Sequence, residues 1–287
     1  MMNLNNRVAI ITGANRGLGE AIARAFANAG AGLVLSARDG DLMQRVAEDI
    51  RQNAKQPVEW LAADVSKQSD IDAIRDHAVG TFSHVDILVN NAGIYGPIGT
   101  FEDTDWQQWC DALQINLFGT VAMSRAIVPL MKKQSYGKII NLSGGGATAP
   151  LPRFTAYAAS KAAVVRFSET IAEELKSSHI DVNAIAPGAL NTRLLDQILE
   201  AGPDLAGEDF YRRSMKQRED GGASLELAAE LAVFLASAES DGITGKLISA
   251  VWDDWRNFAK FRERIQKSDV FTLRRIVPSD RGLELQD

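Results

Sequence analysis

Apolar and polar residues follow two distinct patterns along the chain. Short runs rich in Val, Ile, Leu and Ala predict strands at residues 7–12, 32–37, 58–62, 85–89, 138–142, 180–185 and 246–250. Between the runs, apolar residues recur every three or four positions and predict helices at roughly residues 17–29, 40–54, 67–80, 105–132, 153–177 and 224–237. Strands that alternate with helices pair in parallel through right-handed crossovers, with helices on both faces of the sheet. The pattern therefore predicts an α/β, doubly wound fold.

No repeat, low-complexity linker or shift in composition interrupts this pattern before residue 251. A chain of 287 residues could form one large domain or two small ones. We predict a single domain over residues 1–250 and a carboxyl-terminal extension over residues 251–287.

Composition and charge narrow the classes of function. The chain is 46% hydrophobic and 24% charged, as in ordinary globular proteins, and its net charge of −6 argues against a nucleic-acid or anionic membrane partner. Cys110 is the only cysteine, so an internal disulfide is impossible. No apolar run approaches the ~20 residues of a membrane helix, and the first residues do not resemble a signal peptide. We predict a cytoplasmic protein without a metal site.

A glycine-rich turn, "TGANRGLG" at residues 12–19, joins the first strand to the first helix. Gly13, Gly17 and Gly19 let the backbone turn tightly and approach a ligand closely. The helix behind them directs free N–H groups and a positive dipole end toward that ligand, which suits a pyrophosphate. A glycine-rich turn without a ligand remains the alternative.

The end of the second predicted strand carries Ala37 and Arg38 where dinucleotide-binding folds often have an acidic residue for the ribose hydroxyls. Arg16 stands inside the glycine-rich turn. Two guanidinium groups near one ribose favour a 2′-phosphate, and hence NADP(H) over NAD(H). The alternative is that both arginines are solvated. Asp39 and Asp41 are interpreted as the turn and cap of the next helix.

Tyr157 and Lys161 in "YAASK" are four residues apart and project from one helix face. A nearby ammonium would lower the pKa of the phenol and make it a better acid–base group. Ser143 follows the strand at 138–142, at the edge where doubly wound sheets bind ligands. Such a Tyr–Lys pair alone is common on solvated helices, so the interpretation depends on the other motifs.

In this order, the motifs resemble those of the short-chain dehydrogenase/reductase family, in its compact single-domain branch. They are "TGANRGLG" (12–19), "DV" (64–65), "NNAG" (90–93), Asn116, Ser143, "YAASK" (157–161) and "PGALNT" (187–192). The resemblance covers residues 7 to about 250. It implies a seven-stranded Rossmann sheet, a nicotinamide cofactor and a homodimer or homotetramer.

The resemblance also implies residue roles. Tyr157 would be the general acid–base, Lys161 would hold the nicotinamide ribose, and Ser143 would orient the substrate oxygen. Asn116 would support a water that links Lys161 to solvent. The implied cofactor-binding residues are Gly13, Asn15, Arg16, Gly17, Leu18, Gly19, Arg38, Asp64, Val65, Asn90, Ala92, Gly93, Tyr157, Lys161, Pro187, Gly188 and Thr192.

These roles describe an NADP(H)-dependent oxidoreductase that interconverts an alcohol and a carbonyl on a small-molecule substrate. One alternative remains open, a cofactor-binding sensor or scaffold with little turnover, against which the intact catalytic set argues. Sugar-nucleotide epimerases and dehydratases share the Tyr–Lys spacing, but they use a different glycine spacing and a large carboxyl-terminal substrate domain, for which residues 251–287 are too few.

Substrate walls are expected from residues 95–98, 147–154 and 193–218, which are mostly apolar. The last segment has the charge and glycine content of a mobile lid. Farther along, Trp252, Trp255, Phe258, Phe261 and Ile265 recur every three or four residues and predict an amphipathic helix with an aromatic stripe. We expect this stripe to be buried, at a subunit contact rather than on its own domain.

Overall fold

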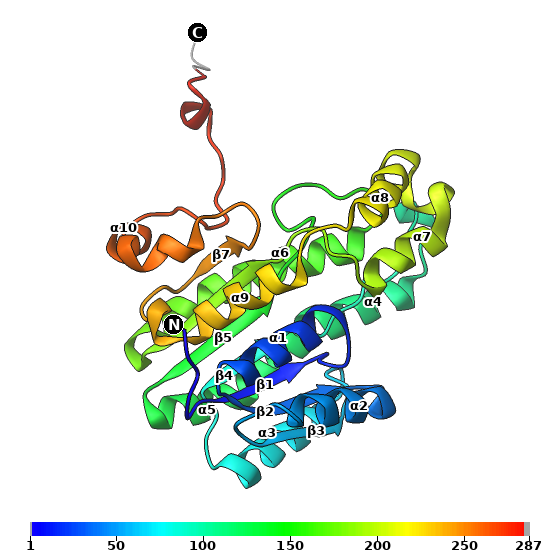
Figure 1. Cartoon of the computed structure of the whole chain (residues 1–287). Helices are drawn as coiled ribbons and strands as arrows, with labels where there is room; N and C mark the ends of the chain where they lie inside the picture. Colours follow the sequence, from blue (N-terminus) through cyan, green and yellow to red (C-terminus); the bar gives the residue numbers. More distant parts are fainter. Residues whose placement is uncertain (1, 284–287) are drawn as a thin grey trace.

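The computed structural model describes residues 2–283 and contains one seven-stranded sheet, ordered β3-β2-β1-β4-β5-β6-β7 (Figure 1). Every neighbouring pair of strands is parallel. The strands are β1 (Val8–Thr12), β2 (Gly32–Ala37), β3 (Val58–Ala62), β4 (Ile87–Asn90), β5 (Gly137–Leu142), β6 (Ile180–Ala186) and β7 (Lys246–Ser249). The predicted doubly wound α/β fold and its seven strands are confirmed.

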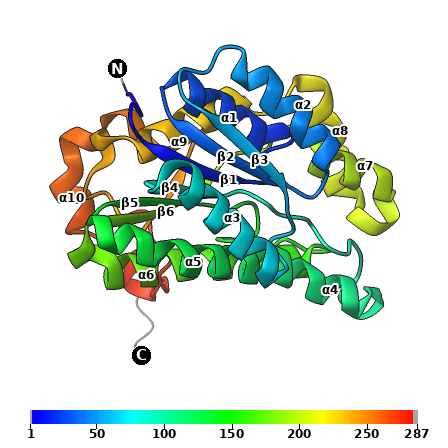
Figure 2. The same ribbon diagram turned by 90° about the horizontal axis from the view of Figure 1, so that it is seen from below.

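Helices cover both faces of the sheet, so there are two cores (Figure 2). The helices are α1 (Gly17–Asn28), α2 (Gly40–Arg51), α3 (Gln68–Phe82), α4 (Trp106–Leu113), α5 (Gly119–Gln134), α6 (Thr155–Leu175), α7 (Arg193–Ala206), α8 (Glu208–Asp220), α9 (Leu225–Ala236) and α10 (Arg262–Gln266). Side chains of α1, α2 and α9 pack in one core, and those of α3, α5 and α6 in the other. Every residue of β1, β2, β4 and β5 is buried, as expected for strands covered on both faces.

The predicted helix over residues 105–132 is broken in the structure. A π-helical turn, Gln114–Phe118, separates α4 from α5. Asn116 lies in this turn, and its buried carboxamide bonds both the N–H and the C=O of Ile94, each at 2.8 Å. π-helical turns inside helices frequently mark functional sites. Apolar periodicity alone does not reveal a break of this length, because the flanking turns keep their buried faces.

The helical stretch from Trp106 to Gln134 is long and apolar enough, by length and composition, to cross a membrane. This differs from the expectation that no such segment exists. A third of its most apolar 18-residue window is buried within the fold. Met123, Ile127 and Met131 from α5 belong to the core beneath the sheet, so a packed core helix accounts for this composition.

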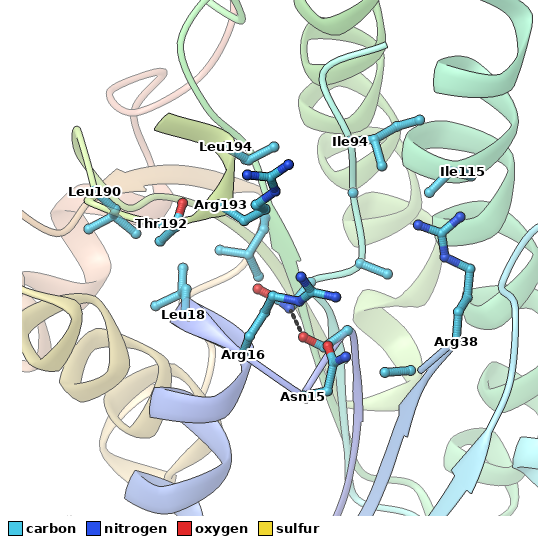
Figure 3. A pocket seen from close by; sticks show the side chains of 18 of the residues that line it. Asn15, Arg16, Leu18, Arg38, Ile94, Ile115, Leu190, Thr192, Arg193 and Leu194 are labelled. Carbon is cyan, nitrogen blue, oxygen red and sulfur yellow. Dashed lines mark hydrogen bonds between the residues drawn. The ribbon is translucent and has the colours of Figure 1, made fainter. Parts of the chain in front are cut away.

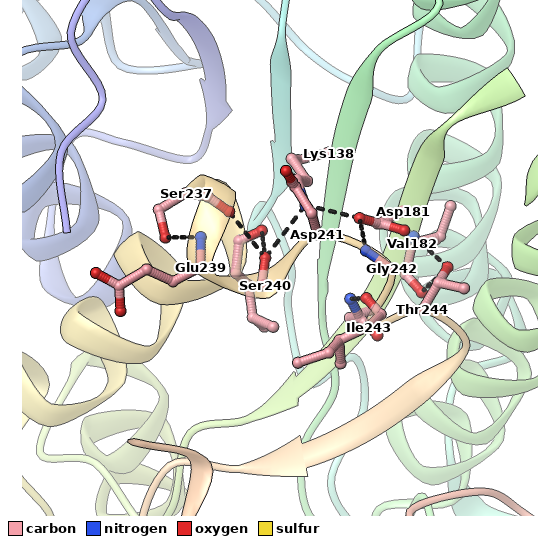
Figure 4. Close-up of polar contacts among 12 residues, drawn as sticks. Lys138, Asp181, Val182, Ser237, Glu239, Ser240, Asp241, Gly242, Ile243 and Thr244 are labelled. Carbon is pink, nitrogen blue, oxygen red and sulfur yellow. Dashed lines mark hydrogen bonds and ion pairs between the residues drawn. The ribbon is translucent and has the colours of Figure 1, made fainter. Parts of the chain in front are cut away.

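An ion-pair network around the buried Lys138 ammonium links the amino-terminal ends of neighbouring strands (Figure 4). The Lys138 ammonium on β5 lies 2.6 Å from an Asp181 carboxylate oxygen on β6 and 2.7 Å from one on Asp241. Lys138 also donates a hydrogen bond of 3.2 Å to Ser240. Because these contacts satisfy the buried charge, Lys138 ties β5 and β6 to the connection that precedes β7.

The carboxyl-terminal extension packs differently from the prediction. A 3₁₀ helix (Trp255–Phe261) and the short α10 replace the single amphipathic helix. Trp255 is 1% exposed and packs against Phe234 of α9, with ring centroids 5.7 Å apart. Trp252 and Phe261, in contrast, are 86% and 48% exposed. The predicted aromatic stripe is therefore partly buried, at Trp255, and partly exposed, at Trp252 and Phe261.

The expected subunit contact is wrong for the buried half of the stripe, because Trp255, Phe258 and Ile265 join the core of their own chain. Farther along, the Leu247 N–H on edge strand β7 donates a 2.8 Å hydrogen bond to the Phe271 carbonyl. The extension thus covers part of the free sheet edge. Residues 284–287 of the predicted extension lie outside the described residues.

Candidate active site

A cleft of about 700 Å³ opens at the carboxyl ends of the strands, where doubly wound sheets bind ligands (Figure 3). Its walls come from the segments that follow β1, β2, β3, β4, β5 and β6. The lining residues are Gly13, Asn15, Arg16, Gly17, Leu18, Gly19, Ser36, Ala37, Arg38, Asp39, Ala63, Asn91, Ala92, Gly93, Ile94, Ile115, Leu142, Ser143, Tyr157, Lys161, Pro187, Leu190, Thr192, Arg193, Leu194 and Gln197.

The glycine-rich turn forms one wall, and its glycines are sterically required. Gly13 has φ +65°, and a Cβ there would lie 2.9 Å from the Ala92 Cα. A Cβ on Gly19 would lie 2.2 Å from the Gly13 carbonyl oxygen. The bare backbone and the amino end of α1 therefore form a cradle that a diphosphate fits.

Asn91 fixes this cradle against the end of β4. Its Nδ2 donates to the carbonyl oxygens of Thr12 and Gly13, at 2.9 and 3.0 Å. The Thr12 hydroxyl in turn accepts from the backbone N–H groups of Asn91 and Ala92. These hydrogen bonds use the carbonyl groups of Thr12 and Gly13, and they hold the turn against the segment that follows β4.

Arg16 and Arg38 extend into the cleft from the glycine-rich turn and from the end of β2 (Figure 3). Both are exposed, and within residues 2–283 neither guanidinium forms a hydrogen bond or an ion pair. Asp39 caps α2, as predicted, by accepting a 3.0 Å hydrogen bond from the Leu42 N–H. The two free guanidinium groups are thus available to an anion.

Ser143 and Tyr157 line the opposite end of the cleft. Ser143 follows β5 directly, and its buried hydroxyl has no hydrogen-bond partner among the described residues. The Tyr157 hydroxyl lies so close to the backbone that a Cβ on Gly144 would be 2.2 Å from it. A buried hydroxyl without a partner costs free energy, so this end is built to receive a polar atom.

Lys161 lies on the same helix as Tyr157, but its ammonium bonds a backbone carbonyl. Its Nζ donates a 2.7 Å hydrogen bond to the Leu142 carbonyl and lies 5.6 Å from the Tyr157 ring centroid. Burial lowers the pKa of Lys161 to about 8. Burial, with a smaller contribution from Tyr95, raises the pKa of Tyr157 above its ordinary value. The expected lowering of the tyrosine pKa by the ammonium is therefore absent in this structure, because desolvation dominates.

Asn116 lies behind this group rather than in the cleft wall. A Cβ on Gly93 would lie 3.1 Å from the Asn116 Oδ1 and 3.5 Å from the Lys161 Nζ. The Asn116 Nδ2 also donates to the Ser160 hydroxyl at 2.9 Å. Asn116 therefore joins the segment after β4 to the helix that carries Lys161.

Four of the residues expected to bind the cofactor do not line the cleft: Asp64, Val65, Asn90 and Gly188. Asn90 points into the fold and donates a 2.9 Å hydrogen bond to Asn141. Asp64 accepts from the Ser66 N–H within its own turn, and Ala63 lines the cleft instead. A motif predicts which segment lies near the cofactor, but successive side chains of an extended segment point to opposite faces, so only some of them reach the cleft.

Several lining residues were not predicted, among them Asn91, which lies inside the "NNAG" motif but was not singled out. Leu194 and Gln197 come from α7, within the segment 193–218 that was expected among the substrate walls, but Gln197 was not singled out. The segment 193–218 was expected to be a mobile lid, and the structure has two helices there, with a kink at Gly202 (φ +77°). Leu194 and Gln197 are three residues apart, so they share one face if the segment is helical. No helix was predicted at this position from the sequence, and the spacing therefore gave no signal.

The segments expected to form the substrate walls contribute an aromatic cluster beside Tyr157, but among its members only Tyr157 lines the cleft. The ring centroids of Tyr95 and Tyr157 are 4.6 Å apart, and those of Phe154 and Phe210 are 4.9 Å apart. Leu195 and Ile198 of α7 pack in the same cluster. Burial raises the pKa of Tyr95 to about 12. Helices α7 and α8 therefore pack next to the Tyr157 ring through this cluster.

Comparison with known proteins identifies the family. A sequence model described as short chain dehydrogenase matches residues 7–202. The chain belongs to the short-chain dehydrogenase/reductase family. It is 33% identical over 245 residues to dehydrogenase/reductase SDR family member 4 of Sus scrofa, covering 85% of this chain and 86% of that protein.

Solved structures of this family share the fold. NAD⁺-bound xylitol dehydrogenase has a TM-score of 0.79 and 25% identity, covering 86% of this chain and 98% of that chain. A 7α-hydroxysteroid dehydrogenase complexed with NADH and 7-oxo glycochenodeoxycholic acid has a TM-score of 0.73 and 29% identity, covering 86% and 94%. This short-chain dehydrogenase/reductase is an NAD(P)-dependent oxidoreductase.

Proposed function

We propose that this enzyme interconverts an alcohol and a carbonyl on a small molecule, with NADP(H) as its preferred cofactor and Tyr157 as general acid–base. The observation that carries the proposal is the end of the cleft where the unpartnered Ser143 hydroxyl, Tyr157 and Lys161 meet. The opposite end of the same cleft carries the two free guanidinium groups of Arg16 and Arg38.

The cleft fits a nicotinamide dinucleotide. The glycine cradle and the amino end of α1 would hold the diphosphate. Arg16 and Arg38 would hold a 2′-phosphate on the adenosine ribose, since a guanidinium matches the geometry of phosphate oxygens. Pro187 and Thr192 would contact the nicotinamide. The similar structures contain NAD⁺ and NADH, so the preference for NADP(H) depends on these two arginines.

The bound nicotinamide supplies or accepts the hydride, and the chain manages the proton. Ser143 would donate a hydrogen bond to the reacting oxygen and hold it beside Tyr157. The raised pKa of Tyr157 keeps the phenol protonated near neutral pH, so it can donate its proton to the oxygen of a carbonyl that is being reduced. Lys161, whose pKa burial lowers to about 8, still carries its charge predominantly near neutral pH and would bond the nicotinamide ribose.

Asn116 would act through Lys161. Its carboxamide holds Ser160 and the backbone of Ile94, which fixes the position of the ammonium relative to the cleft. A cytoplasmic location and a homodimer or homotetramer remain predictions that accompany this proposal.

The test is a titration of the purified protein with NADPH and NADH, followed by a screen of ketones and aldehydes monitored by nicotinamide absorbance. We expect tighter binding of NADPH and turnover of at least one carbonyl class. Tight binding of NADPH without turnover of any carbonyl or alcohol would favour the sensor or scaffold alternative. Equal affinities for both cofactors would refute the NADP(H) preference.

A further inference from the structure

Helix α7 directs one polar side chain into the cleft that the proposed chemistry does not use. Gln197 lines the cleft together with Leu194, one helical turn earlier. The Gln197 Oε1 is buried and has no hydrogen-bond partner within residues 2–283. An unpaired buried amide oxygen destabilises a protein, so this position is costly unless a ligand completes it.

The packing of α7 locates Gln197 at the reactive end of the cleft. Its neighbours Leu195 and Ile198 belong to the apolar cluster that contains Tyr157 and Phe154. Arg38, in contrast, directly follows β2, at the other end of the cleft, where the adenosine ribose is predicted to bind. Leu195 and Ile198 therefore pack one face of α7 beside Tyr157, and the neighbouring face, with Leu194 and Gln197, borders the cleft that Ser143 also lines.

The unpartnered atom limits which ligand groups can complete it. The Gln197 Oε1 accepts hydrogen bonds and cannot donate them, so the ligand has to supply a hydroxyl or an N–H group. A ligand carboxylate, which only accepts, would leave Oε1 unpaired. The walls beside Gln197 include aliphatic side chains such as Leu194. A hydroxyl group on an otherwise apolar small molecule fits both features.

We propose that Gln197 is a specificity-determining residue that hydrogen-bonds a hydroxyl group of a neutral hydroxy-carbonyl substrate. The inference rests on the proposed function, in which Ser143 and Tyr157 hold the reacting oxygen and Thr192 contacts the nicotinamide. The substrate hydroxyl would donate to the Gln197 Oε1. A site built in this way discriminates against an analogue that lacks the hydroxyl, because the buried amide is then left unpaired.

The experiment compares hydroxyacetone with butanone, which differ by a hydroxyl in place of a methyl group. Because the hydroxyl also changes the intrinsic reactivity of the ketone, the quantity measured is the change in the ratio of kcat/KM values between wild type and Gln197→Met. We expect the preference for hydroxyacetone to fall by about tenfold in Gln197→Met. The dissociation constant of NADPH, measured by fluorescence titration, should change less than about twofold.

Gln108→Met is the matched control, because Gln108 lies exposed on α4 and outside the cleft lining. It should leave both quantities unchanged. If neither ketone is turned over, the same ratio is taken from their dissociation constants for the protein saturated with NADP⁺, by calorimetry. An unchanged ratio in Gln197→Met, or absent binding of both ketones, overturns the inference.

A weaker affinity for NADPH with an unchanged ketone ratio would assign the amide to the cofactor and would also overturn the inference. Failure of the proposed function gives a different result in the wild type, namely binding of neither cofactor, or binding of NADPH without turnover of any carbonyl or alcohol.

Discussion

Replacement of Arg38 by alanine tests the cofactor preference most directly. Arg38 lines the cleft at the end of β2 and has no ion pair or hydrogen bond within residues 2–283, so its removal leaves no acidic group unpaired. The change in affinity should then report only the lost contact with the cofactor.

The magnitude follows from the type of contact. A hydrogen bond to a charged group contributes about 1.5–3 kcal/mol, and about 1.4 kcal/mol corresponds to a tenfold change in a dissociation constant. Because Arg38 is exposed and solvent screens its charge, the lower part of this range applies. We expect the dissociation constant of NADPH to rise about tenfold in Arg38→Ala, and that of NADH to change less than about twofold.

The assay is a fluorescence titration of both cofactors at two salt concentrations. The effect on NADPH should shrink at high salt, because screening weakens contacts between exposed charges. Arg45→Ala is the control: Arg45 is also exposed, on α2, but bonds the Asp41 carbonyl and lies outside the cleft lining. A similar loss for NADH and NADPH would mean that Arg38 contacts something other than the 2′-phosphate, and no loss for either would exclude it from the site.

Three further predictions concern the reactive end and the extension. Tyr157→Phe should abolish turnover and leave NADPH affinity nearly intact, because only the transferable proton is lost; a near wild-type rate in the absorbance assay would contradict its role. Gly144→Ala should lower kcat strongly in a folded protein, since the new Cβ would lie 2.2 Å from the Tyr157 hydroxyl; a wild-type kcat would show that the phenol position is unimportant. Trp255→Ala should destabilise the protein by about 3–5 kcal/mol in urea unfolding, whereas Trp252→Ala, at an exposed position, should change stability by less than about 0.5 kcal/mol. Equal effects of the two tryptophan substitutions would mean that the extension does not pack on its own chain.

The way the extension packs changes what truncation should do. The sequence favoured a role in assembly, whereas the structure puts Trp255, Phe258 and Ile265 in the core formed with α9. Removal of residues 251–287 would therefore expose apolar surface of the chain itself. Any effect on assembly has to be separated from this loss of stability.

Much of the fold could be predicted from the sequence because it depends on local and repetitive features. Buried strands are apolar at nearly every position, and the order of strands and helices leaves few ways to form a parallel sheet. The glycine-rich turn could be recognised because it lies between the first predicted strand and the first predicted helix. Its glycines are required, since a Cβ at Gly13 or Gly19 would clash with neighbouring atoms. The four-residue spacing of Tyr157 and Lys161 similarly determines that they share a helix face.

Other properties were decided only by the tertiary structure, because they depend on groups far apart in the chain. The bonds between Asn116 and Ile94 accompany a π-helical turn that no periodicity revealed. The spacing of Tyr157 and Lys161 suggested a lowered tyrosine pKa, but burial of the phenol, with a smaller contribution from Tyr95, raises this pKa instead.

The same holds for side chains whose surroundings a pattern cannot specify. An aromatic stripe establishes that residues will be buried, but not whether the covering surface is their own chain or another, and here α9 covers Trp255. Nothing in the sequence distinguishes Gln197 from other polar residues, and only the packing of α7 brings it to the cleft that Ser143 also lines. Local sequence determines backbone elements, whereas desolvation and the partners of polar groups are fixed only when distant segments pack together.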